Sequence, residues 1–335
     1  MKRFTFLAFF LGAAFLLHAQ VNNLRQPAFL KKGDKVAMIS PSYTLDMAEV
    51  RKATEIISGW GLVPVIGPNA DKLYAGKFAG TPEQRAHDLQ WALEDPDIKA
   101  VICNRGGYGA IHNADYISFD TYSQHPKWLV GFSDITTLHS FEAVAGVMSL
   151  HATMPMEIAE TGGTDLSSAM LKDLLFGKVP EYHIAAHPMN ILGHAEGTLV
   201  GGNLCVLSAL GGSSWDATNL DNIILFIEDV GENMRNIDRL FNTLRVRGVF
   251  NRVKGVIIGE FSDARADINF PSVEAMLRPY VLKYNIPLCC GLPVGHGDTN
   301  LPLIHGADLS LDVTTEGAVL RFMVQGQQYK LWCPQ

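Results

Sequence analysis

Residues 127–141 read KWLVGFSDITTLHSF, a short apolar run that passes through a polar turn into a helical pattern. Two earlier stretches, GDKVAMISPS at 33–42 and KAVICNRGGYGA at 99–110, also carry an apolar run that ends in a turn. Between them, Thr81-Pro82-Glu83-Gln84 supplies an N-cap, a first-turn proline and a capping-box partner, which predicts a helix to about Leu93. Strands that alternate with helices predict a parallel, Rossmann-like sheet, with ligand sites beyond the carboxyl ends of its strands.

The second half of the chain predicts a second domain. Residues 161–194 are polar and rich in glycine and proline, and the segment after them returns to apolar runs. These runs include a strand at 223–230, a second strand at 253–261 and a β-hairpin around Thr314–Gly317. Between the two strands, one helical face carries Ile237, Leu240, Phe241 and Leu244. We therefore predict an N-terminal α/β domain at 24–165, a crossover linker at 166–194, and a mixed α/β domain with a β-rich end at 195–335.

Composition and charge exclude several classes of protein. Hydrophobic residues make up 47% of the 335 residues, charged residues 18%, and 31 glycines are spread along the chain, which indicates a globular protein. The 27 basic and 34 acidic residues give a net charge of −7, and no stripe of Lys or Arg is present to neutralise a run of phosphates. We therefore expect no nucleic-acid partner.

The N-terminus has the layout of a signal peptide. In MKRFTFLAFFLGAAFLLHAQ, two cations precede an apolar run that is shorter than the ~20 residues of a spanning helix. Cleavage after Ala19 fits the small residue that is preferred there, whereas Leu17 fits less well, so an uncleaved membrane anchor is the alternative. We predict that residues 1–19 direct export to the periplasm or the medium, without stable membrane insertion of the mature chain.

The five cysteines do not indicate a disulfide framework or a zinc site. Their number is odd, and no Cys-x-x-Cys spacing is present. Cys103, Cys205, Cys289 and Cys290 lie in apolar runs, where free thiols are expected to be buried.

Ser133 is the first candidate for chemistry. It lies between the apolar run and the helix start in Gly131-Phe132-Ser133-Asp134-Ile135-Thr136. A serine on such a turn presents its hydroxyl above the sheet, as a nucleophile requires. The pattern is not Gly-x-Ser-x-Gly, and Ser and Asp are also ordinary helix N-caps. From this motif alone, a nucleophile and a cap both remain open.

A second candidate is the glycine-rich stretch Asn104-Arg105-Gly106-Gly107-Tyr108-Gly109, which follows an apolar strand. Its glycines permit a close approach of the backbone to a ligand, and its N–H groups are able to bind an oxyanion or a phosphate. Loops of this composition often serve only as turns.

Candidate acid and base residues lie in the second half. Glu228 closes the strand IILFIEDV, with Asp229 next to it, and His296 lies between two glycines in Leu292-Pro293-Val294-Gly295-His296-Gly297-Asp298. A partly buried carboxylate needs a partner, and a histidine is the natural one. His151, His194 and His305 are alternatives for the histidine. A metal site from Asp298 and His305 is a weaker hypothesis, because no ligand spacing supports it.

Together, the motifs GFSDIT, NRGGYGA, FIEDVGE and LPVGHGD resemble the LD-carboxypeptidase family of serine peptidases, which includes muramoyltetrapeptide carboxypeptidases and microcin-immunity peptidases. The resemblance extends over nearly the whole mature chain. It implies an N-terminal domain that carries the serine, Ser133, and a C-terminal domain that supplies Glu228 and His296. It also implies a homodimer, and it places the family's muropeptide enzymes in the cytoplasm, unlike the export predicted for this chain. Catalysis by a serine, a histidine and a glutamate requires no metal or cofactor.

The chemistry of such a site follows from these side chains. Ser133 attacks an amide carbonyl, His296 takes the hydroxyl proton, and Glu228 orients the imidazole. The backbone N–H groups of Asp134 and Gly107 are the expected oxyanion hole.

We therefore predict a serine carboxypeptidase that removes a terminal D-alanine from L,D-linked murein tetrapeptides. Arg105 is the candidate for binding the terminal carboxylate, and Tyr108 for lining the same pocket. Two alternatives remain at this point: a microcin-immunity-like amidase that cleaves peptidyl conjugates, and an exported solute-binding protein without catalysis.

Overall fold

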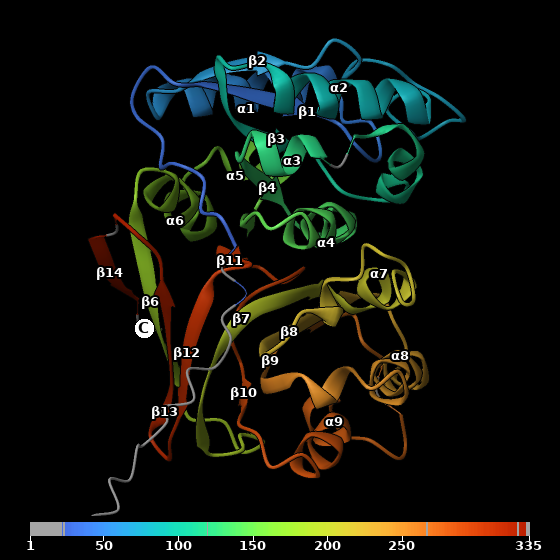
Figure 1. Cartoon of the computed structure of the whole chain (residues 1–335), viewed down its shortest axis with the longest axis vertical. Helices are drawn as coiled ribbons and strands as arrows, with labels where there is room; N and C mark the ends of the chain where they lie inside the picture. The colour runs from blue at the N-terminus through green and yellow to red at the C-terminus, as the bar shows by residue number, and fades with distance from the viewer. Residues whose placement is uncertain (1–21, 23, 119, 266, 327, 333–335) are drawn as a thin grey trace, which may run out of the picture.

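The computed structural model describes residues 22, 24–118, 120–265, 267–326 and 328–332, which form two lobes, each built on its own sheet (Figure 1). The predicted signal peptide at 1–19 lies outside the described residues. Within the described ranges, no helix is long and apolar enough to cross a membrane.

The N-terminal lobe is a six-stranded sheet with strand order β11-β5-β4-β3-β1-β2. Its first five strands in the chain are parallel where they pair. These strands are β1 Lys35–Ile39, β2 Val63–Ile66, β3 Ile98–Cys103, β4 Trp128–Gly131 and β5 Ser149–His151. The helices of this lobe are α1 Met47–Gly59, α2 Pro82–Glu94, α3 Asp120–Gln124, α4 Thr136–Val144 and α5 Pro155–Thr161, with 3-10 turns η1 Ala110–Tyr116 and η2 Ser133–Ile135. The predicted parallel α/β architecture is confirmed.

Local sequence signals explain several element boundaries. The Thr81 side chain accepts a hydrogen bond from the Gln84 N–H, and the Gln84 side chain accepts one from the Thr81 N–H, which forms the expected capping box at the start of α2. Strands β1 and β3 end at Ile39 and Cys103, where polar turn residues follow. The turns that follow β1, β3 and β4 therefore lie at the same edge of the sheet.

The C-terminal lobe is an eight-stranded mixed sheet with strand order β10-β9-β8-β7-β12-β13-β6-β14. Its strands are β6 Lys178–Ala185, β7 Gly193–Asn203, β8 Ile223–Val230, β9 Val253–Ser262, β10 Leu288–Cys290, β12 Asp308–Val313, β13 Gly317–Met323 and β14 Gln328–Trp332. Helices α6 Leu166–Leu175, α7 Leu204–Ala209, α8 Met234–Val246 and α9 Val273–Leu282 accompany it, with turns η3 Ala217–Asn219 and η4 Val249–Asn251.

Two features of this lobe follow the sequence pattern closely. Helix α8 buries Ile237, Phe241 and Leu244, with Leu240 half-buried beside them. Strands β12 and β13 pair in antiparallel register as the expected hairpin. The stretch 166–194, expected to be a linker, contains α6 and strand β6, whose buried residues alternate with more exposed ones toward its end.

One correction concerns the cysteines. Cys103, Cys289 and Cys290 are buried as expected, but Cys205 is exposed, so its predicted burial is wrong. Cys205 lies in the first turn of α7, where its N–H donates to Asp229 Oδ2 and its side chain faces away from the buried Leu204 and Leu207. An apolar run on a short helix does not bury every position.

The two lobes are interlocked by β11, Leu303–His305. This strand comes from the C-terminal part of the chain but pairs in antiparallel register with β5 of the N-terminal sheet. His305 on β11 stacks on His139 of α4 with ring centroids 5.6 Å apart, and His151 of β5 lies 5.1 Å from the ring of Phe226 on β8. The three histidines are fully buried, so this seam is packed with aromatic rings from both lobes.

We expect this histidine seam to make stability fall on acidification. Burial lowers the pKa of His139 to about 4, and it lowers the pKa values of His151 and His305 well below their usual range. The unfolded chain therefore binds more protons below pH ~6.5, and each histidine costs about 1.4 kcal/mol of stability per pH unit between its unfolded and folded pKa values. Urea unfolding at pH 7.5, 6 and 5 measures this slope. The variant His305→Leu should have a shallower slope, and equal slopes in both proteins would contradict this account.

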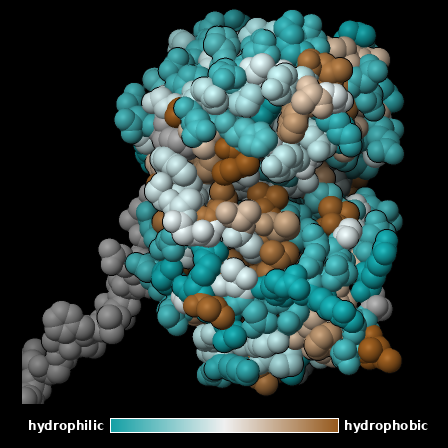
Figure 2. Space-filling view, turned by 90° about the vertical axis from the view of Figure 1, so that its right-hand side faces the viewer, coloured by the Kyte–Doolittle hydropathy of each residue, from teal (hydrophilic) through white to brown (hydrophobic). Residues whose placement is uncertain are grey.

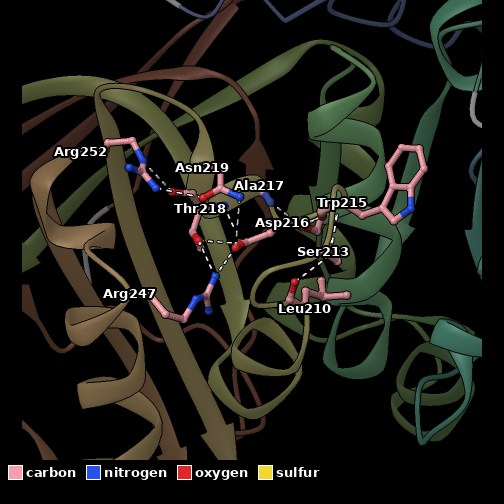
Figure 3. A network of polar contacts seen from close by, with 10 residues as sticks. Leu210, Ser213, Trp215, Asp216, Ala217, Thr218, Asn219, Arg247 and Arg252 are labelled. Carbon is pink, nitrogen blue, oxygen red and sulfur yellow. Dashed lines mark hydrogen bonds and ion pairs between the residues drawn. The ribbon is translucent and has the colours of Figure 1, made fainter.

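A buried ion pair fixes the loop that follows α7 (Figure 3). The fully buried Asp216 carboxylate pairs with Arg247 and accepts hydrogen bonds from the Thr218 N–H and hydroxyl. The same loop reaches the other lobe, because Ser140 Oγ of α4 donates to Trp215 O and accepts from the Ala217 N–H. The network thus joins both lobes to the end of α8.

Loss of the arginine in this pair should be strongly destabilising. In Arg247→Met, the buried Asp216 charge keeps its hydrogen bonds but loses its counter-charge. We expect a loss of about 3 kcal/mol in the free energy of unfolding, measured by urea denaturation. Arg235→Met on the same helix is the matched control, because the Arg235 side chain is 80% exposed and its pair with Asp267 lies at the surface. Equal losses in the two variants would contradict a special role for the buried pair.

Candidate active site

Ser133 occupies a strained turn between β4 and α4. Its φ is +64°, the left-handed region that non-glycine residues rarely adopt, and it follows Phe132 in extended conformation. Such a residue costs about 1–3 kcal/mol, a strain that proteins concentrate at functional sites. Gly131 is required before it, because a Cβ there would lie 2.9 Å from Ile135 Cγ1. The backbone thus has the form of a nucleophile elbow although the Gly-x-Ser-x-Gly pattern is absent.

The alternative role of Ser133 and Asp134 as helix caps does not match the hydrogen bonds. The residue at the N-cap of α4 is Ile135, and no side chain caps that helix. Asp134 instead accepts hydrogen bonds from Ser42 Oγ at 2.6 Å and from the Ala110 N–H at 2.8 Å. Its carboxylate is buried, and burial raises its pKa while these two bonds act in the opposite direction. Asp134 therefore ties the serine turn to the loops that follow β1 and β3, a role that the sequence did not reveal.

The glycine-rich loop lies directly against the serine turn. A Cβ at Gly106 would be 2.9 Å from Ser133 Cβ and 3.3 Å from the Asp134 nitrogen. Gly107 has a φ of +117°, and a Cβ there would overlap the ring of Tyr43. Glycine is thus required at both positions. The predicted oxyanion-hole residues are Asp134 and Gly107. Asp134 directly follows Ser133 and Gly107 directly follows Gly106, so both adjoin the contact between Gly106 and Ser133.

Glu228 and His296 form a buried pair in the other lobe. His296 Nδ1 lies 2.7 Å from Glu228 Oε2, where Glu228 is fully buried at the end of β8 and the His296 side chain is 17% exposed. Gly295 has a φ of +121°, and a Cβ there would lie 2.8 Å from Glu228 Oε2. The Gly295 N–H also donates to Asn300 Oδ1. The glycine before the histidine therefore allows the loop to pass over the carboxylate.

The pKa values of this pair reflect burial and mutual contact. Burial lowers the pKa of His296, but the hydrogen bond and the charge of Glu228 outweigh it, so the pKa is raised above its usual value. Burial raises the pKa of Glu228, and the contact with His296 opposes part of that rise. The arrangement fixes the imidazole with Nδ1 toward the carboxylate and leaves Nε2 for other partners.

The serine turn and the histidine pair meet at the seam between the lobes. The rings of Phe132, the residue before Ser133, and His296 have centroids 4.9 Å apart. Asn203 of β7, which is in register with Glu228, donates its N–H to Thr136 Oγ1 of α4. Helix α4 also contacts α7, and the surface on that side is hollowed into a waist along which hydrophobic side chains gather (Figure 2).

The other predicted histidines have different surroundings, although the His151 ring lies 6.0 Å from the ring of Phe132 and so borders the site. His151 and His305 are fully buried in the seam, and among the residues that the structure describes no ring nitrogen of either has a hydrogen-bond partner. His194 is exposed and pairs with Asp312 on the hairpin side of the C-terminal sheet. Across the part of the chain that the structure describes, no group of three or more His, Cys, Asp or Glu is placed to hold a metal ion.

Arg105 and Tyr108, the candidate substrate-binding residues, flank the glycine loop. The Arg105 guanidinium lies 5.8 Å from the centroid of the Tyr43 ring, and its Nη1 donates to Thr44 O at 3.5 Å. Its Nε is buried and has no hydrogen-bond partner in the described part of the chain. Tyr108 is 52% exposed and packs against Phe78. Both side chains thus flank the glycine loop, whose Gly106 contacts Ser133.

Glu157 is a residue of the site that sequence reasoning missed. Its Oε2 accepts the Met154 N–H at 3.0 Å at the start of α5. Burial raises its pKa to about 7, and the charges of His296 and Arg105 oppose part of that rise. The only signal in the sequence was Pro155 followed by an acid two residues later, which is typical of a helix start rather than of a site.

Comparison with known proteins adds independent evidence. Residues 36–152 match the LD-carboxypeptidase N-terminal domain, and residues 196–311 match the LD-carboxypeptidase C-terminal domain. A putative carboxypeptidase of Synechocystis is 34% identical over 293 residues, which cover 87% of this chain and 95% of that protein. A probable murein peptide carboxypeptidase of Bacillus subtilis is 31% identical, with 88% of this chain and 94% of that protein covered.

A solved structure shows the same architecture. The crystal structure of a muramoyltetrapeptide carboxypeptidase from Oxalobacter formigenes matches with a TM-score of 0.78 and 25% identity, over 88% of this chain and 99% of that one. Both lobes are therefore included in the match.

Proposed function

The chain belongs to the LD-carboxypeptidase family of serine peptidases, and from that premise we propose that it removes a C-terminal D-alanine from murein tetrapeptides. Membership of this family makes it a hydrolase and a peptidase, and not a solute-binding protein without catalysis. The observation that carries the proposal is the 2.7 Å contact between His296 and the buried Glu228, next to a serine held at a positive φ.

The proposed chemistry proceeds through an acyl-enzyme. Ser133 Oγ attacks the carbonyl carbon of the L,D-peptide bond while His296 Nε2 takes its proton, and Glu228 stabilises the imidazolium that forms. The N–H groups of Asp134 and Gly107 stabilise the oxyanion, at about 3 kcal/mol for each donor. The proton then passes from His296 to the amine of the leaving D-alanine as the C–N bond breaks. Water hydrolyses the acyl-serine with His296 again as the base.

Recognition of a free C-terminus is proposed for Arg105. A guanidinium binds a carboxylate through two parallel N–H bonds, and Arg105 has a buried Nε without a protein partner beside the glycine loop. A peptide substrate without a free carboxylate next to the scissile bond would leave this donor unpaired.

We also propose that the enzyme acts after export. The cationic start and apolar run of residues 1–19 support this location, where intact cell-wall peptides are within reach.

Release of D-alanine from muropeptides of defined sequence tests the function. The purified mature chain is incubated with a murein tetrapeptide that ends in D-alanine, with the same peptide ending in L-alanine, and with its C-terminal amide. We expect rapid cleavage of the terminal residue from the first peptide alone, with no release of L-alanine from the second, which has the wrong configuration, or of D-alaninamide from the third, which lacks the carboxylate. Equal cleavage of the amide would overturn the role of Arg105, and no cleavage of the first peptide would overturn the proposed function.

A further inference from the structure

We propose that four aromatic side chains beside the serine turn close the leaving-group side of the site after a single residue and so make the enzyme an exopeptidase. These side chains, Tyr43, Phe78, Tyr108 and His112, are called the aromatic wall below. The inference rests on the proposed function and adds the structural reason for its restriction to one terminal residue.

The rings of the wall form a continuous contact chain. The centroids of Tyr43 and Phe78 are 5.5 Å apart in an edge-to-face arrangement, and those of Phe78 and Tyr108 are 6.1 Å apart. His112 lies 5.8 Å from Phe78 and 5.3 Å from Tyr108. Contacts of this geometry stabilise aromatic pairs beyond their burial. The wall is therefore one cohesive surface rather than four separate side chains.

This surface begins next to the nucleophile. The Tyr43 N–H donates to Gly106 O at 3.4 Å, and the Tyr43 ring fills the space where Gly107 has no side chain. Gly106 in turn contacts Ser133, since a Cβ there would lie 2.9 Å from Ser133 Cβ. The adjacent residues Gly106 and Gly107 thus contact Ser133 and the first ring of the wall, respectively.

The position of Arg105 indicates which side of the scissile bond the wall occupies. His296 hands its proton to the leaving amine, so the leaving residue must lie on the His296 side of Ser133. Under the proposed function, Arg105 binds the carboxylate of that leaving residue, and Arg105 directly precedes Gly106, which contacts Ser133. The Arg105 guanidinium lies over the face of Tyr43, 5.8 Å from its centroid. A terminal carboxylate bound by Arg105 would therefore end against the wall.

The wall is held from behind by a buried arginine. Arg85 is 1% exposed and donates to the carbonyl oxygens of Pro41, Gly80 and Gly109, and its guanidinium lies 5.1 Å from the Phe78 ring centroid. These bonds fix the backbone on both sides of the wall. A longer leaving group is thus not accommodated by a simple displacement of Phe78, because Arg85 would lose its contact with the ring.

The wall predicts a preference between two natural muropeptides. A residue of extended peptide spans about 3.3–3.6 Å, so a pentapeptide that ends in two D-alanines would carry its carboxylate one residue past Arg105 and into Tyr43. The wild-type enzyme should therefore cleave tetrapeptides much faster than pentapeptides at the same L,D bond.

The test measures kcat/KM for release of D-alanine from the tetrapeptide and of D-alanyl-D-alanine from the pentapeptide. In Tyr43→Ala and Phe78→Ala, the pentapeptide-to-tetrapeptide ratio should rise at least tenfold, even where the tetrapeptide rate itself falls. Tyr43→Phe keeps the ring, and Tyr116→Ala removes an exposed tyrosine of the same lobe that is not in the wall. Both controls should keep the wild-type ratio.

Three results would overturn the proposed role of the aromatic wall. One is a wild-type enzyme that cleaves both peptides equally well. Another is an unchanged ratio in alanine variants that still turn over the tetrapeptide. The third is a selective loss of activity of the alanine variants on tetrapeptides that carry the disaccharide. This result would place the wall on the acyl side of the scissile bond. Absence of any D-alanine release by the wild-type enzyme would overturn the proposed function and the wall together, so the two failures are distinguishable.

Discussion

Substitution of Ser133 by alanine should abolish the release of D-alanine from murein tetrapeptide, with a fall in kcat of about 10⁶-fold. Removal of the hydroxyl leaves no group at the end of β4 to form the acyl-enzyme, while the glycine loop and the His296–Glu228 pair remain in place. The fold should persist. Alanine keeps the Cβ and the same difficulty with a φ of +64°, so the strain is unchanged.

The assay compares single-turnover D-alanine release by the variant and the wild-type enzyme at high enzyme concentration. Ser140→Ala is a matched control, because Ser140 is a buried serine of the neighbouring helix α4 whose hydroxyl bonds to the loop at Trp215–Ala217. The control should keep its turnover. Comparable turnover in Ser133→Ala and the wild-type enzyme would rule out this nucleophile.

The second large effect is expected for Glu228→Gln, with a loss in kcat of about 10⁴-fold. The amide is similar in size to the carboxylate but is uncharged, so it stabilises neither the imidazolium nor the required tautomer. The hydrogen bond to Glu228, followed by the charge of Glu228, is also the main influence that raises the pKa of His296 against the effect of burial. His296 should therefore titrate at lower pH in the variant than in the wild-type enzyme.

The dependence of kcat/KM on pH shows the direction of this change in the pKa of His296. His296 acts as a base only when neutral, so kcat/KM should rise with pH through an inflection above the ordinary value of about 6.5 in the wild-type enzyme. In Glu228→Gln, the inflection should move to lower pH, and the plateau value of kcat/KM should also be lower. Asp229→Asn is the comparison, because the Asp229 carboxylate binds the Asn203 amide and the Cys205 N–H and raises the pKa of His296 only through its charge and less than Glu228 does, so its inflection should move less than that of Glu228→Gln. A flat wild-type profile from pH 5 to 8 would contradict a histidine base.

Much of the fold was predictable because its signals are local. The alternation of apolar runs with polar turns at 33–42, 99–110 and 127–141 determines a parallel sheet, and a capping box marks the start of α2. Strand β11 was not predictable, since a three-residue apolar run carries no information about which sheet it joins. Strand β6 was hidden by its proline and charged residues, which are permitted where only part of the strand is buried.

The site shows the same division between local and long-range information. Ser133 and His296 stand out because each follows a strand in a distinctive turn, and Glu228 because it is an acid near the end of an apolar strand. The left-handed φ of Ser133 is a consequence of its turn. The carboxylate of Asp134 was misleading, since an acid after a serine resembles a cap until its partners Ser42 and Ala110 are seen. The aromatic wall could not be inferred, because its rings come from three separate loops that only the fold brings together.

The central claim is that side chains from two lobes act as one catalytic unit across their seam, and non-additivity measures this most directly. The experiment compares D-alanine release from radiolabelled tetrapeptide by Ser133→Ala, His296→Ala and the double variant in single turnover. When two residues act together, removal of either one already removes their joint contribution to the rate. The double variant should therefore be no slower than Ser133→Ala alone. Losses that multiply in the double variant would show that Ser133 and His296 act independently and would contradict the account.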